Sequence, residues 1–144
     1  MLIVKHTVET SATPEDIWGI WQDVTNWNKW DDGIEFSAID GPFAKGTTGT
    51  LKPKGGPVVR TVLTRVEPMK MFVEESKVFL ARMIVSHFLS ESEGKTQVTH
   101  QIEMTGLFAF IYARFIGPTM KKNLTQGMEV MVKEAEALGK TKNS

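Results

Sequence analysis

The sequence predicts an α+β fold in which an antiparallel sheet is covered by one long C-terminal helix. Seven short β-rich segments are separated by turn residues, and a long apolar-faced helical pattern follows the last of them. No helical spacing interrupts the last six segments, which favours a meander of hairpins over parallel βαβ units. A chain of 144 residues can bury one core of this kind. We therefore expect a single domain over residues 1–138 and a flexible tail over residues 139–144.

The predicted strands are rich in β-branched residues or alternate between apolar and polar side chains. Turn-forming residues separate them, among them Gly41-Pro42, Gly55-Gly56-Pro57 and Glu93-Gly94. On this basis we expect strands over residues 3–10, 34–39, 47–52, 58–66, 71–78, 80–90 and 96–105.

Two short helical segments are expected between the first two strands. Thr13-Pro14-Glu15-Asp16 has the pattern of a helix start, with Thr13 as the N-cap and acidic residues in the first turn. All four tryptophans of the chain follow within a few residues, at positions 18, 21, 27 and 30. We interpret them as a packed hydrophobic corner, with direct ligand contact, above all by Trp30, as the alternative.

The long helix is predicted over residues 107–138. Steps of three and four residues place apolar side chains on one face, which is the spacing of a helix that packs on a sheet. Its first half is apolar almost all round, which indicates cover on more than one side, and Pro118 predicts a bend near Gly117. The predicted apolar face comprises Phe110, Ala113, Gly117, Met120, Leu124, Met128, Met131, Ala135 and Leu138.

Composition excludes several classes of function. The formal net charge is zero and the basic residues are scattered along the sequence, so we expect no nucleic-acid partner. The chain has no cysteine, which excludes disulfides and thiolate chemistry and suits the cytoplasm. We see neither a secretory signal nor an apolar run long enough for an integral membrane segment.

The last hairpin places two histidines together. A two-residue turn at Glu93-Gly94 sets a provisional register in which His87 faces His100. Alternation then puts both on the apolar face, together with Met83, Val85, Leu89, Val98, Ile102 and Met104. The imidazoles could orient a ligand or transfer a proton, or they could be core histidines that are satisfied within the protein. Without an inward carboxylate or cysteine they form an incomplete metal site, so we expect no metal and no cofactor.

Other candidate ligand contacts follow from the same alternation. Tyr112 is the only tyrosine and lies where the helix is apolar all round, so its hydroxyl needs a partner. It is either a packing residue, which we favour, or a ligand contact. Arg60 alternates with Val58 and Val62, which allows an inward orientation. The residues predicted to line a cavity are His87, His100, Met83, Val85, Ile102, Met104, Phe110, Tyr112, Met120, Leu124, Arg60 and Trp30. No catalytic constellation emerges.

The order of elements and several landmarks resemble the START-like proteins of the SRPBCC superfamily, which include the birch-pollen allergen and the polyketide cyclase/dehydrase and lipid transport group. The landmarks are Thr13-Pro14-Glu15-Asp16-Ile17-Trp18, Trp27-Asn28-Lys29-Trp30, Gly41-Pro42-Phe43 with Gly46, Val66-Glu67-Pro68, and Gly94-Lys95-Thr96-Gln97-Val98-Thr99-His100 with Gly106. The resemblance implies a helix-grip fold, in which a curved sheet grips the final helix around a deep apolar cavity. It transfers no catalytic residue.

Three functional hypotheses follow. The first is a binding module for a small, mainly apolar molecule such as a lipid or polyketide-like compound, oriented by one or both histidines. The second is a metal-independent cyclase, dehydratase or isomerase that uses an inward histidine as general acid or base. The third is a protein-interaction domain that uses the tryptophan-rich corner or the apolar start of the last helix. The sequence leaves the ligand and the oligomeric state open.

Overall fold

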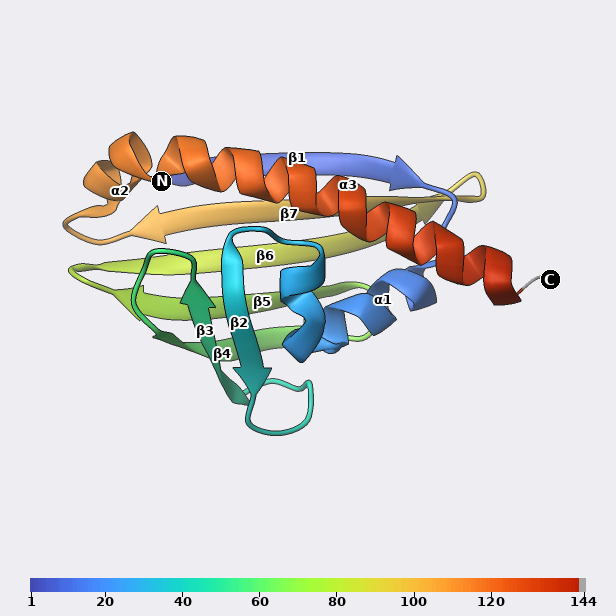
Figure 1. The fold of residues 1–144 in the computed structure, drawn as a ribbon, viewed down its shortest axis with the longest axis horizontal. Helices are drawn as coiled ribbons and strands as arrows, with labels where there is room; N and C mark the ends of the chain where they lie inside the picture. The colour runs from blue at the N-terminus through green and yellow to red at the C-terminus, as the bar shows by residue number, and fades with distance from the viewer. Residues whose placement is uncertain (143–144) are drawn as a thin grey trace.

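Seven antiparallel strands form one curved sheet in the order β1-β7-β6-β5-β4-β3-β2 (Figure 1). The structure is a computed structural model, and it describes residues 1–142. The predicted meander is confirmed, and each predicted strand differs from the observed one by at most two residues at an end. The strands are β1 Leu2–Thr10, β2 Ile34–Ile39, β3 Thr48–Pro53, β4 Val59–Glu67, β5 Met71–Val78, β6 Ala81–Ser92 and β7 Lys95–Thr105.

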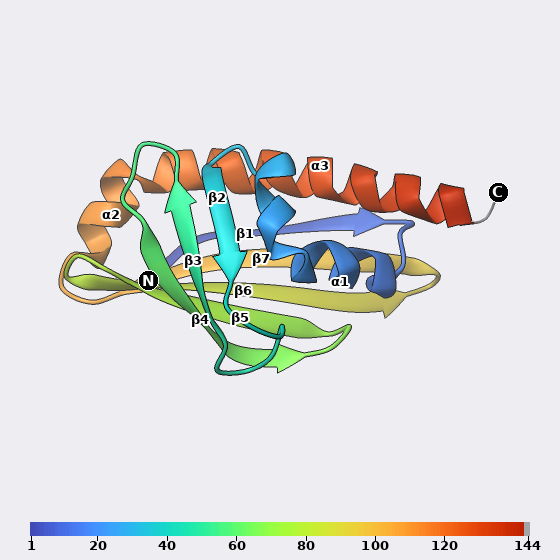
Figure 2. The same ribbon diagram turned by 60° about the horizontal axis from the view of Figure 1, so that its bottom comes forward.

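The helices lie on the concave, inner face of this sheet (Figure 2). They are α1 Pro14–Gln22, the 3₁₀ helix η1 Val24–Lys29, α2 Ala109–Phe115 and α3 Gly117–Lys142. The longest of them, α3, packs on β1 and α1. This arrangement is the predicted α+β helix-grip fold. In the described part of the chain, no helix combines the length and apolar character that crossing a membrane requires.

Helix α1 and the last hairpin confirm two local predictions. The Thr13 side chain caps α1 by accepting a hydrogen bond from the Asp16 backbone N–H at 3.2 Å. Glu93 and Gly94 have φ angles of 53° and 77°, the left-handed geometry of a two-residue hairpin turn. This turn sets the predicted register, with His87 opposite His100 and Val85 opposite Ile102.

The prediction of a single long helix over residues 107–138 is wrong in detail. The chain forms two helices that meet at Ile116, the C-cap of α2, because Pro118 cannot donate a backbone hydrogen bond to continue α2. The prediction of a flexible tail from residue 139 onward is wrong for residues 139–142, because α3 continues to Lys142. Residues 143–144 lie outside the described residues.

The inner face of α3 follows the predicted spacing along its middle. Leu124, Met128, Met131 and Ala135 are buried. Gly127 allows the close approach to η1, because a Cβ atom there would lie 2.9 Å from the Trp30 carbonyl oxygen. The two ends of the predicted apolar face are wrong, since Phe110 and Leu138 are exposed. The first half of the predicted helix, around Phe110, is therefore partly open to solvent, whereas the sequence predicted that other segments would cover it on more than one side.

Candidate functional site

One half of the inner face of the sheet is filled by aromatic rings. Trp21 is fully buried there, with its ring 5.3 Å from Phe72, 5.4 Å from His87 and 5.6 Å from His100. His87 stacks on Phe72 with a centroid distance of 3.8 Å. We call this group the aromatic cluster; its members are Trp18, Trp21, Trp27, Trp30, Phe43, Phe72, His87 and His100.

The two histidines face inward, as predicted, but they are packed inside the aromatic cluster. Their rings are 4.5 Å apart. Burial lowers the pKa of His87 well below its usual range, and repulsion from His100 adds to the shift. Burial also lowers the pKa of His100 to about 3, with a smaller contribution from His6. Both imidazoles are therefore neutral at physiological pH, which argues against a histidine as the acid or base of a reaction.

Several polar atoms of the aromatic cluster lack a hydrogen-bond partner among the described residues. They are the ring nitrogens Trp21 Nε1, Trp30 Nε1, His87 Nδ1 and His100 Nε2. By contrast, Trp27 Nε1 donates to the Trp21 carbonyl oxygen at 2.9 Å. Unpaired buried nitrogens cost stability. The aromatic cluster thus combines dense ring packing with unfilled hydrogen-bonding capacity.

The other half of the inner face is covered less completely. Met83, Val85 and Ile102 point inward beside the histidine pair but are only half-buried. Met120 and Tyr112, which pack against the core from α3 and α2, are also half-buried. We call this region the open half. It lies toward the end of the sheet where β6 begins and β7 ends.

Glu74 lies at the border between the aromatic cluster and the open half. On β5 it pairs with Leu63 of β4 and Val85 of β6, two residues beyond the buried Phe72. Alternation therefore places its side chain on the inner face. No hydrogen bond or ion pair joins the Glu74 carboxyl to another described residue. It is an inward carboxyl without a partner.

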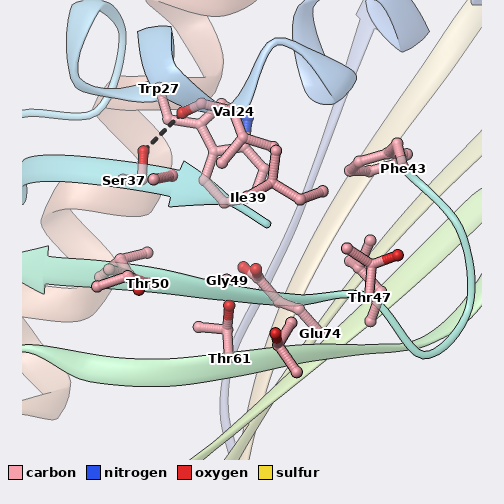
Figure 3. A pocket seen from close by; sticks show the side chains of 14 residues that line it. Val24, Trp27, Ser37, Ile39, Phe43, Thr47, Gly49, Thr50, Thr61 and Glu74 are labelled. Carbon is pink, nitrogen blue, oxygen red and sulfur yellow. Dashed lines mark hydrogen bonds between the residues drawn. The ribbon is translucent and has the colours of Figure 1, made fainter. Parts of the chain in front are cut away.

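The Glu74 side chain lines a narrow cavity between β2, β3 and the body of the sheet (Figure 3). The cavity volume is about 20 Å³, enough for about one water molecule. Trp27 and Phe43 of the aromatic cluster also border it, so these rings occupy much of the space where the family resemblance implies a deep cavity. Its polar lining includes Ser37, Thr47 and Thr61, while Ile39, Leu51 and Leu63 supply apolar walls.

Two carboxyl groups of this region have raised pKa values. Burial raises the pKa of Glu74 to about 8, and the negative charge of Asp31 adds to the rise. Burial also raises the pKa of Asp31, although the Gly33 backbone N–H, which donates to its Oδ1 at 2.8 Å, opposes the shift. At neutral pH the Glu74 carboxyl is therefore mainly protonated, and it can donate a hydrogen bond as well as accept one.

The remaining predicted contacts divide into inward and outward residues. Leu124, Met104 and Trp30 are buried within the core. Tyr112 donates a hydrogen bond from its hydroxyl to the Phe79 carbonyl oxygen at 3.0 Å, which provides the partner its position requires. The inward orientation of Arg60 is wrong. Its guanidinium is exposed and pairs with Asp40 at 2.7 Å, because β3 presents Thr48 and Thr50 beside it on the outer face.

Sequence reasoning missed Glu74, although the signal was present. The alternation of Phe72, Glu74 and Ser76 puts the carboxyl on the same face as a large apolar ring. Glu74 and Glu75 lie on opposite faces of β5 by alternation, but no turn residue in the sequence fixes which of the two faces is inward. The register of β5 against the histidine hairpin settles the question, since Phe72 pairs with His87.

A wider hollow of about 380 Å³ lies between α1, η1 and the C-terminal part of α3. Its rim carries the carboxylates Glu15, Asp23 and Glu134, which are exposed. We interpret it as a solvated surface groove. Within residues 1–142, no group of three or more His, Cys, Asp and Glu side chains is arranged to hold a metal ion.

Comparison with known proteins places the chain in a family. Residues 1–136 match the sequence profile described as polyketide cyclase / dehydrase and lipid transport. The chain belongs to this family. The match covers both the sheet and most of α3, so the fold and the family agree. No curated protein matches the chain.

Several solved structures share the fold of this chain at low sequence identity. A hypothetical protein from Helicobacter pylori is 10% identical, with a TM-score of 0.76 over 91% of this chain and 86% of that one. The di-domain aromatase/cyclase StfQ from the steffimycin biosynthetic pathway is 8% identical, with a TM-score of 0.78 over 96% of this chain and 52% of StfQ. A START superfamily protein from Mycobacterium smegmatis is 18% identical, with a TM-score of 0.65 over 91% and 97%. These likenesses concern the fold alone.

Proposed function

We propose that the protein binds a small, mainly apolar molecule against the open half, with the Glu74 carboxyl as the group that orients it. The observation that carries the proposal is the unpartnered inward carboxyl of Glu74 beside half-buried apolar side chains. Glu74 is half-buried, and a ligand hydroxyl or carbonyl would give its carboxyl group a hydrogen-bond partner. The family description, which includes lipid transport, is consistent with this class of ligand.

This proposal changes the role given to the histidines. Because His87 and His100 are enclosed by Trp21, Trp30 and Phe72, a ligand reaches Glu74 before it reaches either imidazole. Met83, Val85, Ile102, Tyr112 and Met120 are the proposed apolar contacts. The cavity beside Glu74 has room for only about one water molecule, so binding requires the side chains around Glu74, including those that line this cavity, to move apart.

Native mass spectrometry of the purified protein, followed by thermal shifts with a panel of lipids and aromatic ketones, tests the proposal. A co-purifying apolar molecule, or a ligand that raises the melting temperature, is the expected result. Glu74→Leu should weaken binding by about tenfold, because the orienting hydrogen bond is lost.

Glu75→Leu is the matched control, since Glu75 is the next residue but faces the opposite side of the sheet, where it pairs with Arg82. Equal weakening by both variants would rule out an orienting role for Glu74. If no compound binds the wild type, the binding proposal itself fails.

A second candidate function is a cyclase or dehydratase reaction. It is favoured by the pKa of Glu74, which burial raises to about 8 and which suits a general acid near neutral pH. In a dehydration, Glu74 would give its proton to a leaving hydroxyl as the C–O bond breaks. The resulting carboxylate would take a proton from the neighbouring carbon, and water would leave.

Turnover distinguishes the two candidates. An enzyme should convert a β-hydroxy ketone to the unsaturated ketone, and Glu74→Gln should lower kcat by at least about a hundredfold with a smaller change in KM. A binding protein should retain the compound without converting it. Product formation by Glu74→Gln at the wild-type rate would exclude Glu74 as the acid.

A further inference from the structure

Large apolar side chains are exposed together at one end of the molecule. Phe79, Leu107, Phe110 and Phe115 have exposed fractions of 71%, 71%, 61% and 74%. They belong to the turn between β5 and β6 and to the chain around α2, which meet at the end where α2 lies in Figure 1. We call this surface the apolar tip; it comprises Phe79, Leu80, Leu107, Phe110, Phe115 and Ile116.

Several contacts hold the two segments of the apolar tip together. The Phe108 backbone N–H donates to the Leu80 carbonyl oxygen at 3.0 Å, and the Tyr112 hydroxyl donates to the Phe79 carbonyl oxygen at the same distance. The rings of Phe79 and Phe108 are 5.7 Å apart. The apolar tip is therefore a formed surface and not two independent loops.

The exposed rings do not make a single stripe. Phe110 and Phe115 are five positions apart, so at about 100° per residue they point to different sides of α2. A groove on a protein partner accepts one face of a helix. A surface that is apolar on several sides of a short helix fits better into a medium that surrounds it, such as the boundary region of a bilayer.

Positive charge surrounds the apolar tip. Residues 76–82 and 104–128 contain Lys77, Arg82, Arg114, Lys121 and Lys122 but no acidic residue, in a chain whose formal net charge is zero. Three acidic side chains adjoin these segments in the sequence. Glu75 pairs with Arg82, Glu103 accepts a hydrogen bond from Gln101, and the exposed Glu129 follows the second segment on α3. The fold thus gathers basic residues that looked scattered in the sequence.

This charge argues against a second copy of the chain as the partner. A two-fold dimer through the apolar tip would bring the same basic rim against itself, which is repulsive. We propose that the apolar tip docks on the surface of a bilayer that contains anionic lipids, with the phenylalanines in the boundary region and the basic rim at the headgroups. The proposal does not depend on the function of Glu74.

Vesicle co-sedimentation tests this docking directly. The wild-type protein should bind vesicles of phosphatidylcholine mixed with phosphatidylglycerol, bind pure phosphatidylcholine much more weakly, and be released as salt concentration rises. The double variant Phe110→Ser/Phe115→Ser and the double variant Lys121→Glu/Lys122→Glu should each lose at least about tenfold in vesicle affinity.

Matched controls distinguish docking through the apolar tip from effects of unfolding and from nonspecific adsorption to vesicles. Phe36→Ser/Phe88→Ser removes two exposed phenylalanines elsewhere, and Lys133→Glu/Lys140→Glu reverses two charges in the C-terminal part of α3. Both control variants should bind vesicles like the wild type, and circular dichroism should show that all four variants are folded.

Three results would overturn the proposal. One is the absence of binding to vesicles that contain phosphatidylglycerol. Another is equal loss of binding in the tip and control variants. The third is a dimer in sedimentation velocity that Phe110→Ser/Phe115→Ser abolishes while vesicles fail to bind the protein, which would assign the apolar tip to self-association.

Discussion

The two halves of the inner sheet face are built from the same strands but are covered very differently. Beneath α1 and η1, Phe72 and the histidine pair are buried by the rings of Trp18, Trp21, Trp27 and Trp30, which pack against them. Toward α2, Met83, Val85 and Ile102 stay half-buried. The covering segments, and not the strands, decide how much of the concave face is filled.

Under the proposed function, the aromatic cluster stabilises the fold and the open half binds the ligand. Dense ring packing in the aromatic cluster contributes apolar burial and edge-to-face contacts, which stabilise the fold. The open half contributes less to stability, but it leaves apolar surface and the Glu74 carboxyl available to a ligand. Three predictions test this division, beginning with the largest expected effect.

Removing a central ring of the aromatic cluster should destabilise the protein strongly. Trp21 is fully buried against Trp18, Phe72 and both histidines, so Trp21→Ala should cost about 3 to 5 kcal/mol of unfolding free energy. Met83→Ala in the open half should cost only about 1 kcal/mol, because that side chain is already partly exposed. Urea unfolding near neutral pH measures both, and equal losses would refute the division.

Acid should destabilise the protein through the two buried histidines. Both have lowered pKa values in the folded state, so in the unfolded chain they take up protons from about pH 6.5 downward while the folded chain resists. The contribution of the two histidines to the unfolding free energy is therefore complete above about pH 6.5. It decreases as pH falls, by up to about 1.4 kcal/mol per pH unit for each histidine.

The variant His87→Phe keeps a ring stacked on Phe72 but removes one titrating group. Its unfolding free energy, normalised at neutral pH, should fall less steeply with acid than that of the wild type. Denaturant unfolding at a series of acidic pH values measures the two slopes, and identical slopes would show that His87 does not contribute.

Glu74 should have the opposite and smallest effect. Its pKa is raised from 4.5 to about 8, so its contribution to stability is complete below pH 4.5 and is lost as pH rises through about 8. The histidines complicate the lower part of this range, which leaves pH 6.5 to 8 as the clear window. Over that window the wild type should lose about 1 to 2 kcal/mol.

Replacing Glu74 with Gln should flatten this loss, because the amide cannot ionise. Glu75→Gln, on the outer face, should keep the wild-type slope. Unfolding free energies from urea titrations across the window provide the comparison. A variant slope as steep as that of the wild type would mean that a group other than Glu74 is responsible.

Local patterns predicted much of the fold. Alternation and turn residues gave the seven strands, and Glu93-Gly94 gave the register that brings His87 opposite His100. The same alternation could not say how tightly the histidines would be enclosed, because the rings that enclose them come from α1 and η1. Burial, and with it the lowered pKa of each imidazole, depends on these long-range contacts.

Errors occurred where a residue's surroundings come from distant parts of the chain. Arg60 was included among the candidate ligand contacts because its strand spacing allows an inward orientation, whereas its ion pair with Asp40 on the outer face depends on the pairing of β3 with β4. Phe110 was assigned to the packed face of a continuous helix, but the break at Ile116 separates α2 from α3 and leaves Phe110 exposed. Glu74 was overlooked because its alternation with Phe72 is only a hint, and the pairing of Phe72 with His87 is what fixes the inward face of β5.

The sequence by itself determined the α+β class, the meander, the hairpin register and the caps and turns, because these depend on neighbours in the chain and on side-chain periodicity. Only the tertiary structure decided which half of the inner face is filled, where Glu74 stands without a partner, and that basic residues from two segments surround one apolar tip. Those properties arise when segments far apart in sequence exclude water from one another, and no local pattern specifies how completely they do so.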